Sequence, residues 1–265
     1  IGSFSATQSF TTPITSLAVP AGQSTLSFYY KDLIPSISTI VVSDQSVIDD
    51  PVDIGLINAN KNITITWGAP AKIFINGATT TTAGSAKQIR LGLKNSFDVA
   101  IPSSQNQLLY LFSDSASGSF SNGANTITQI VLPQGQTDIP VFYTDTVSGN
   151  KTLTVSDSSS FPEDPDIGLI NATGQITIAS ADFARLAFLG LSQSLESGQS
   201  SLSISVQTQD IFGNPYTATD TMTVYPFTTS ITGAFSLTSS FSATITQLTI
   251  PVGGNNTVLY YKDQT

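Results

Sequence analysis

The sequence predicts an all-β protein built from tandem antiparallel β-sandwich modules of about 113 residues each, and three observations support this prediction. First, the heptapeptide Asp-Ile-Gly-Leu-Ile-Asn-Ala occurs at Asp53–Ala59 and again at Asp166–Ala172, so that equivalent positions differ in number by 166 − 53 = 113. Second, the same offset places Phe28–Asp32 on Val141–Asp145 without a gap. Third, apolar and polar residues alternate with the period of a strand, whereas the period of a helix is hard to find. The chain is therefore interpreted as an array of similar units.

Part of the repeat occurs a third time near the end of the sequence. Val19–Gln23 corresponds to Leu132–Gln136, and Ile250–Gly254 repeats the same block. Leu259–Asp263 then repeats Val141–Asp145, with equivalent positions differing in number by 261 − 143 = 118. A short insertion between the second and third copies explains the longer offset.

Strand-like alternation identifies the expected elements in chain order. It is clearest in five segments, which are Thr126–Leu132, Ile139–Tyr143, Lys151–Val155, Gln175–Ala179 and Ser201–Thr208. Turn signals rich in Gly, Asn and Pro separate such segments at short intervals, as at Ser148–Asn150 and Gly213–Pro215. Short strands with this spacing are typical of an Ig-like antiparallel sandwich.

One segment carries a resemblance to a known family. Ser201–Pro215 ends in Asp210-Ile-Phe-Gly213-Asn214-Pro215 and resembles the second-strand signature of bacterial Ig-like (Big) modules, in which this turn joins two strands. Gly233–Phe235 and Pro251–Gly254 follow the middle strands of the same family, which resemble repeats in secreted adhesins, invasins and cell-surface layer proteins. In the middle copy the turn is degenerate, since Leu93–Asp98 reads Leu-Lys-Asn-Ser-Phe-Asp. The resemblance implies an extracellular, cell-surface repeat protein.

Superposing the copies predicts the module boundaries. Ala71 and Ala184 fall at equivalent places, so residues 71–183 form one complete repeat. Residues 1–70 then correspond to the later strands of a preceding repeat, and residues 184–265 to the earlier strands of a following one.

Two interpretations of the incomplete terminal modules remain. In one, the two partial modules complete each other between chains and build a head-to-tail filament. Gly2–Asp32 and Gly233–Asp263 carry the same part of the repeat, however, so joining the two partial modules would duplicate about two strands rather than complement them. We favour the second interpretation, in which the sequence is a window of about two periods from a longer repetitive chain. The expected partners are neighbouring copies of the chain or adjacent repeats.

Composition excludes several classes of function. Charged residues form only 10% of the chain, against about a quarter in ordinary soluble proteins, and the net charge of −9 disfavours nucleic acid as a partner. The absence of Cys and His removes thiolate, imidazole and catalytic-triad chemistry and the usual zinc and copper sites. No apolar run of about 18 residues is present, so we expect no membrane span in this segment and an export signal or anchor outside it. We predict that the chain is not an enzyme, because a catalytic carboxylate pair has no reason to recur in every module.

Acidic clusters recur in the first two copies and are the candidate metal ligands. Asp50 and Asp53 lie in copy one, and Asp164 and Asp166 lie in the equivalent part of copy two. Calcium takes about 6 to 8 oxygen ligands, which carboxylates and backbone carbonyls near a module junction would provide. The spacing matches no EF-hand loop, and Asp-Pro pairs are also ordinary turn formers. No cofactor is required by the sequence, and calcium is the one metal that it suggests.

Exposed aromatic side chains are the candidate ligands for a cell-surface glycan. Trp67, Tyr29, Tyr30, Tyr260 and Tyr261 are the residues concerned. Adjacent residues on a strand point to opposite faces, so one tyrosine of each pair is expected to fill the core.

These observations predict a structural role. The modules are expected to act as stiff spacers or building blocks of a surface filament, sheath, S-layer or adhesin stalk. The alternative is a cell-surface binding module that recognises carbohydrate or a host protein through the loops at one end of the sandwich. The aligned stretches Ala78–Gln88 and Leu191–Ser201 differ in sequence, which permits variable recognition loops.

Overall fold

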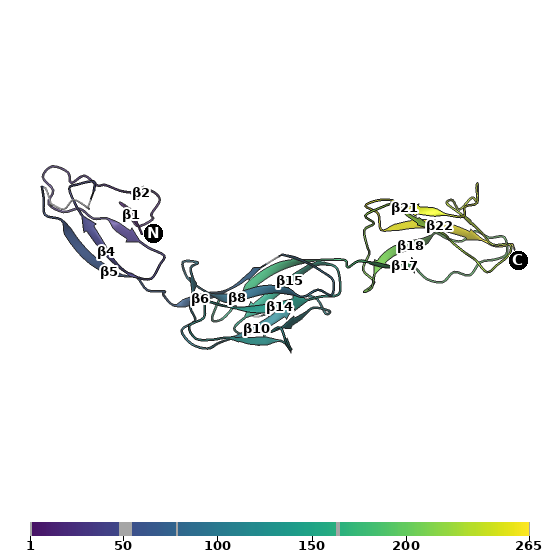
Figure 1. Ribbon diagram of the computed structural model, residues 1–265, viewed down its shortest axis with the longest axis horizontal. Coiled ribbons are helices and arrows are strands. Elements are labelled where there is room, and N and C mark those ends of the chain that lie inside the picture. The colour runs from purple at the N-terminus through teal and green to yellow at the C-terminus, as the bar shows by residue number, and fades with distance from the viewer. Residues whose placement is uncertain (1, 48–54, 78, 163–164, 265) are drawn as a thin grey trace.

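The computed structural model describes residues 2–47, 55–77, 79–162 and 165–264. Every regular element within these ranges is a strand, and no helix there is long enough to cross a membrane. The strands fall into three groups that follow one another along the long axis of the molecule (Figure 1). We call them module 1 (β1–β5), module 2 (β6–β16) and module 3 (β17–β22). The predicted all-β fold of Ig-like sandwich modules with incomplete ends is confirmed, while the residue-level boundaries stay predictions.

Module 2 is a complete two-sheet sandwich. One sheet has the strand order β13-β10-β15-β16-β7, and the other has the order β12-β11-β14-β8-β6, with β9 also paired to β8. All pairs are antiparallel except β16 with β7. The strands are β6 (Pro70–Gly77), β7 (Thr80–Thr82), β8 (Lys87–Asn95), β9 (Ala100–Ile101), β10 (Gln107–Ser113), β11 (Ser119–Ser121), β12 (Thr126–Ile127), β13 (Gln129–Leu132), β14 (Asp138–Thr144), β15 (Gly149–Ser156) and β16 (Ala172–Ala179).

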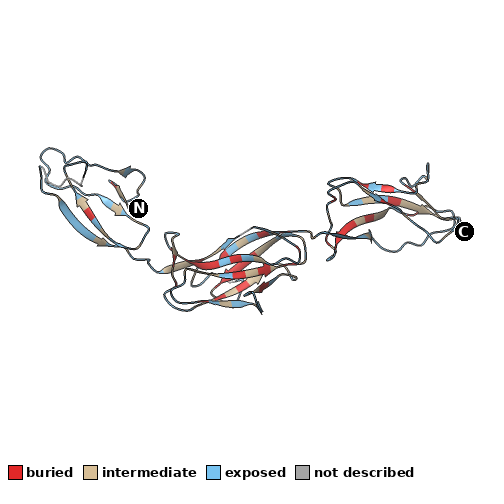
Figure 2. Cartoon of the chain, in the orientation of Figure 1, coloured by how far each residue is buried: buried red, intermediate tan, exposed pale blue. Residues whose placement is uncertain are grey.

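The core of module 2 lies between its two sheets. Alternate residues of the strands point inward, and Leu91, Leu109, Val141 and Val155 are completely buried there. Figure 2 shows that buried positions are concentrated in the strands of this module. Burying each such side chain contributes roughly 1.5 to 3 kcal/mol, so the inward positions of the alternating segments are a major stabilising contribution to the module.

The expected strand at Thr126–Leu132 is divided in the structure. Thr126–Ile127 (β12) pairs with β11 in one sheet, whereas Gln129–Leu132 (β13) pairs with β10 in the other. Thr128 marks the crossing, because its carbonyl accepts a hydrogen bond of 2.9 Å from the N–H of Leu111 in β10. Alternation alone predicts strand character but not the sheet to which each half belongs.

Modules 1 and 3 contain overlapping parts of this sandwich, because both carry counterparts of β11 and β14. The strands of module 1 are β1 (Ser3–Ser5), β2 (Pro13–Ile14), β3 (Tyr29–Lys31), β4 (Ile37–Val42) and β5 (Ala59–Thr64), and those of module 3 are β17 (Phe183–Leu189), β18 (Ile204–Asp210), β19 (Met222–Val224), β20 (Ala234–Ser236), β21 (Leu248–Ile250) and β22 (Asn256–Lys262). Among the described residues, module 1 lacks counterparts of β6–β10, and module 3 lacks counterparts of β15 and β16. Ile40 is the one buried hydrophobic residue described in module 1.

A small unit of four residue types recurs in all three modules. A glycine precedes a phenylalanine by two positions, and the phenylalanine ring packs at a tilt against a tyrosine whose hydroxyl donates a hydrogen bond to an aspartate two residues later. The ring pairs are Phe4–Tyr30 at 5.2 Å, Phe120–Tyr143 at 5.1 Å and Phe235–Tyr261 at 5.3 Å. The hydroxyl-to-carboxylate distances are 3.0 Å to Asp32, 2.9 Å to Asp145 and 2.7 Å to Asp263. The repeat is therefore conserved in three dimensions as well as in sequence within this chain.

Candidate functional site

The contact between modules 2 and 3 is centred on Asn214, a residue that is 7% exposed. The Asn214 side-chain amide donates a hydrogen bond of 2.8 Å to the carbonyl of Thr146. Its carbonyl oxygen accepts one of 2.9 Å from the N–H of Ser148. Both partners lie in the loop between β14 and β15, so one side chain of module 3 binds the backbone of module 2 at two points. We call this pair of hydrogen bonds the Asn214 clasp.

Asp210 holds Asn214 in place. One oxygen of its carboxylate accepts the N–H groups of Phe212 at 2.9 Å and Asn214 at 2.8 Å. The other oxygen accepts the Asn214 side-chain amide at 2.8 Å and the N–H of Ala181, in the segment that links the modules, at 2.9 Å. Gly213 has φ +92°, a conformation that a residue with a side chain rarely adopts, which explains the glycine in this turn. The carboxylate therefore holds both the turn at residues 210–214 and the segment between β16 and β17 that links the two modules.

The hydrogen bonds to Asp210 also set its acidity. Burial alone raises the pKa of this carboxyl, but the hydrogen bonds from Asn214, Ala181 and Phe212 favour the charged form and lower the pKa below its ordinary value of 3.8. The side chain is ionised whenever the joint is formed at neutral pH.

An aromatic contact lies beside the clasp. The ring of Phe212 packs over Gly84, in the loop between β7 and β8, and a side-chain carbon placed on Gly84 would lie 2.5 Å from the ring. The N–H of Gly84 also donates to the carbonyl of Asp145 at 2.8 Å. Gly84 is thus required for close approach of the two modules at this point.

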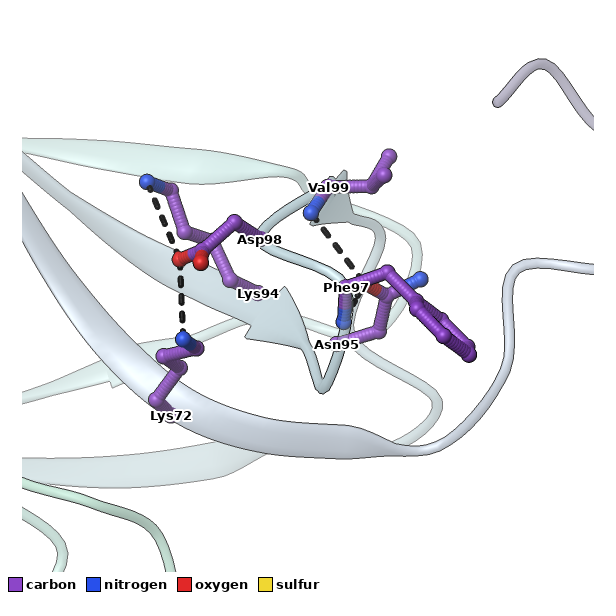
Figure 3. Close-up of polar contacts among 6 residues, drawn as sticks. All are labelled: Lys72, Lys94, Asn95, Phe97, Asp98 and Val99. Atoms are coloured by element: carbon purple, nitrogen blue, oxygen red, sulfur yellow. Dashed lines mark hydrogen bonds and ion pairs between the residues drawn. The ribbon is translucent and has the colours of Figure 1, made fainter. Parts of the chain in front are cut away.

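Module 2 carries the same turn at its opposite end, facing module 1. Asn95 occupies the place of Asp210, and its side-chain oxygen accepts the N–H groups of Phe97 at 2.9 Å and Val99 at 3.1 Å (Figure 3). Asp98, with φ +64°, occupies the place of Gly213. Its carboxylate oxygen Oδ1 lies 2.9 Å from the Nζ atom of Lys72, and this ion pair lowers the pKa of the Asp98 carboxyl. The turn that the sequence shows as degenerate keeps its geometry, because Asn supplies the same acceptor oxygen as Asp.

The joint between modules 1 and 2 nevertheless lacks a clasp. Val99 stands in the place of Asn214, and Pro35, which has no N–H, stands in the place of Ser148. Asn95 instead donates its side-chain amide to the carbonyl of Trp67 at 2.8 Å, within the connecting segment. Phe97 is 76% exposed, whereas its counterpart Phe212 is 45% exposed. The two joints are therefore built differently.

Three of the four predicted calcium ligands, Asp50, Asp53 and Asp164, lie outside the described residues. Asp166 accepts the N–H of Asn171 at 3.0 Å, which closes the loop before β16. The described part of the chain contains no group of three or more acidic residues gathered around a possible metal position. Calcium binding therefore stays a prediction.

The predicted glycan-binding aromatics do not gather at one place. Trp67 lies in the connection between β5 and β6, whereas the tyrosine pairs lie on β3 and β22 of different modules. Tyr30 and Tyr261 point inward to their phenylalanine partners, as expected for one member of each pair. Tyr29 is 42% exposed. Their arrangement follows the architecture of each sandwich rather than a shared binding surface.

Solved structures resemble this chain in fold. They include FdeC, an adhesin of Escherichia coli, at 12% identity and a TM-score of 0.39, and InvD of Yersinia pseudotuberculosis at 13% and 0.36. Domains 4 and 5 of the S-layer protein SbsC match at 13% identity and a TM-score of 0.28. The matches cover 75%, 88% and 46% of this chain and 57%, 63% and 59% of those chains, respectively. Neither a family profile nor a curated protein matches the sequence.

Proposed function

We propose that this chain is a structural part of an extracellular repeat protein, in which the modules serve as stiff spacers or building blocks of a surface filament, sheath, S-layer or adhesin stalk. The Asn214 clasp is the observation that supports the proposal most directly, because it ties one side chain of module 3 to two backbone groups of module 2 and so restrains one module against the next. The resemblance to bacterial Ig-like (Big) repeats and a location at the cell surface form part of the same proposal.

The alternative role, recognition through the loops at the end of a sandwich, has less support in module 2. Its loop between β7 and β8 contains Gly84, which lies beneath the ring of Phe212. The loop between β14 and β15 carries the backbone groups that bind Asn214. Both loops of module 2 thus contact module 3, which leaves less of their surface for an external ligand.

Replacing Asn214 by valine should loosen the joint between modules 2 and 3. The change copies Val99 of the neighbouring joint. It removes the two hydrogen bonds of the clasp, each worth about 0.5 to 1.5 kcal/mol, and also the bond that the Asn214 amide donates to Asp210. Because the chain has no cysteine, spin labels can be attached to Ala124→Cys and Ser239→Cys without further changes. Pulsed electron paramagnetic resonance should show a narrow distance distribution in the labelled parent and a broad one in the Asn214→Val chain.

Two further variants make this experiment decisive. Ser148→Pro removes the N–H donor, as Pro35 does in the other joint, and should broaden the distribution in the same way. Asn256→Val makes the same chemical change at an exposed position of β22 and should leave the distribution narrow. A distribution that stays narrow in Asn214→Val would contradict the proposal that the clasp stiffens the array.

Calcium binding by Asp50, Asp53, Asp164 and Asp166 is proposed as an addition to this role. In module 2, one carboxylate oxygen of Asp157 and the side-chain oxygen of Asn171 are buried without a hydrogen-bond partner close to this part of the sequence. Calorimetry with added calcium and then with chelator should show stabilisation of module 2, by about 2.7 kcal/mol at a free calcium concentration of about one hundred times Kd. Asp166→Asn should reduce the shift, and identical transitions with calcium and chelator would exclude the site.

A further inference from the structure

A single peptide unit of module 2 lies between a buried carboxylate and the Asn214 clasp. The N–H of Val147 donates a hydrogen bond of 2.9 Å to Oδ1 of Asp145. The carbonyl of the same trans peptide unit belongs to Thr146 and accepts the side-chain amide of Asn214 at 2.8 Å. Because a trans peptide unit is planar and its N–H and C=O point in opposite directions, the bond to Asp145 determines where this carbonyl points. The carbonyl is thereby directed at module 3.

The core of module 2 fixes the position of Asp145. The residue is completely buried, and its oxygen Oδ2 accepts the hydroxyl of Tyr143 at 2.9 Å. Its oxygen Oδ1 also accepts the hydroxyl of Ser117, in the turn between β10 and β11, at 2.5 Å. Burial alone raises the pKa of this carboxyl, but hydrogen bonds from Ser115, Ser117 and Val147 lower the pKa below its ordinary value of 3.8. The side chain is therefore a charged acceptor at neutral pH.

The backbone of Asp145 supports the aromatic contact beside the clasp. Its carbonyl accepts the N–H of Gly84 at 2.8 Å, and Gly84 lies beneath the ring of Phe212. The side chain of Asp145 holds the peptide unit that binds Asn214, and its carbonyl holds the glycine that receives Phe212. One residue of module 2 is thus bonded to both of the loops that module 3 contacts.

Asn214 completes a continuous chain of hydrogen bonds between the two modules. Its side-chain amide nitrogen carries two hydrogens and donates to the carbonyl of Thr146 and to Oδ2 of Asp210, at 2.8 Å each. Asp210 is completely buried in module 3, as Asp145 is in module 2. The chain therefore runs from one buried carboxylate to the other through one peptide unit and one side-chain amide. Hydrogen bonds in such a series polarise and strengthen one another.

Module 1 separates the local role of this aspartate from its role at a joint. Asp32, the counterpart of Asp145, accepts the hydroxyl of Tyr30 at 3.0 Å and the N–H of Ile34 at 3.1 Å. Val99, in the place of Asn214, has no side-chain donor for the corresponding carbonyl. The aspartate therefore holds its loop by the same bonds where no clasp exists. This indicates that the aspartate prepares the loop and that Asn214 binds to a loop already formed.

We propose that Asp145 is the positioning residue of the joint between modules 2 and 3, which orients the Thr146–Val147 peptide unit for Asn214 and so connects the core of module 2 to the orientation of module 3. Asn214 makes the contact, and Asp145 acts through it. The inference rests on the proposed role of the clasp. It adds that the tyrosine–aspartate unit, which recurs in every module, controls a joint as well as the packing of its own sandwich.

Hydrogen exchange of single amides, followed by NMR in the whole chain, tests this role. The N–H of Ser148 donates to Asn214 rather than to Asp145, so its protection from exchange reports whether the clasp is closed. Asp145→Ala should raise the exchange rate of Ser148 by about tenfold or more, to the rate in Asn214→Val. In an Asn214→Val background, Asp145→Ala should cause no further rise, because both changes act through the same contact. Unchanged exchange of Ser148 in a folded Asp145→Ala chain would overturn the proposal.

Tyr143→Phe is the matched control in the same module. It removes the hydrogen bond from the core to Oδ2 of Asp145 and leaves the bond between Oδ1 and the N–H of Val147. Module 2 should therefore unfold at a lower temperature, while Ser148 stays as protected as in the parent. If Tyr143→Phe raised the exchange rate of Ser148 as much as Asp145→Ala does, the effect would follow the stability of module 2 in general, and the proposal would be wrong.

Asp145→Asn decides the question if module 2 does not fold with alanine. Asparagine keeps an oxygen for the N–H of Val147 but loses the charge, and a charge-assisted hydrogen bond is roughly twice as strong as a neutral one. The amides of Val147 and Ser148 should then exchange faster together, and faster exchange of Val147 alone would refute the coupling. Exchange reports closure of the clasp, whereas spin-label distances report stiffness of the joint, so failure of this inference and failure of the proposed function are distinguishable.

Discussion

Replacing Asp210 by alanine should lower the free energy of unfolding of module 3 by about 3 to 5 kcal/mol. The carboxylate is fully buried and accepts hydrogen bonds from Ala181, Phe212 and Asn214. A hydrogen bond to a charged group contributes about 1.5 to 3 kcal/mol, and the N–H groups left behind lose their acceptor. In calorimetry of the whole chain, module 3 should unfold at a lower temperature than in the parent. The spin-label distance distribution across the joint should also become broader.

Asp210→Asn is the matched control for this experiment. Asn95 forms the same turn in module 2, so asparagine should preserve the bonds from the N–H groups of Phe212 and Asn214 and destabilise the module less than alanine does. It loses the oxygen that accepts from the N–H of Ala181, in the link, and from the side-chain amide of Asn214. Equal losses for alanine and asparagine would show that the turn does not depend on this acceptor.

The ionised carboxylate of Asp210 should also make the joint between modules 2 and 3 sensitive to acid. The pKa of Asp210 is lower in the folded chain than its ordinary value of 3.8. The charged form therefore stabilises the fold at pH values above the unfolded pKa, and this contribution is lost as the pH falls through the folded pKa. Between about pH 5 and pH 2, module 3 of the parent should lose more stability than module 3 of Asp210→Asn, which has no charge to titrate at this position.

Replacing Gly118 by valine should destabilise module 2 by about 3 kcal/mol, within the upper range for overpacking of a core. A side-chain carbon at Gly118 would overlap the hydroxyl of Tyr143 and lie 2.9 Å from the hydroxyl oxygen of Ser113. Tyr143 cannot move aside easily, because it is fully buried and donates a hydrogen bond to Asp145. The midpoint of thermal unfolding of module 2 should fall by roughly 10 °C.

The equivalent change in module 3 provides the comparison. Gly233 precedes Phe235 and faces the hydroxyl of Tyr261, but Tyr261 is only partly buried and is therefore less confined than Tyr143. Gly233→Val should therefore cost less than Gly118→Val. A larger loss in module 3 would show that the burial of the tyrosine does not determine the cost of the added side chain.

The sequence predicted the repeated architecture because each module repeats the residues that determine its own folding. The alternation of Gln175–Ala179, which lies within β16, and the contact of one tyrosine of each pair with a phenylalanine depend only on strand period and local packing, and both agree with the structure. The division of Thr126–Leu132 between two sheets escaped prediction, because a change of sheet at Thr128 leaves the alternation almost unbroken.

The contact between modules 2 and 3 was not predicted from the sequence, although one of its residues, Asn214, was already singled out. Asn214 belongs to the turn that carried the family resemblance, but its partners Thr146 and Ser148 are distant in sequence, in the loop before β15, and are bound through their backbones. Almost any residue type can supply a backbone N–H or carbonyl, so the sequence does not show which residues bind in this way. The available clue was the replacement of Ser148 by Pro35 in the internal alignment, since proline removes the donor on which the clasp depends.

That replacement has a consequence for the reach of a long array. Where every joint carries a clasp, the end-to-end distance of the array grows in proportion to the number of modules. Where proline removes the donor and the joint bends freely, the distance grows closer to the square root of that number, as in a flexible chain. In an array of the proposed kind, the residues at the positions of Ser148 and Asn214 would therefore influence how far the modules extend.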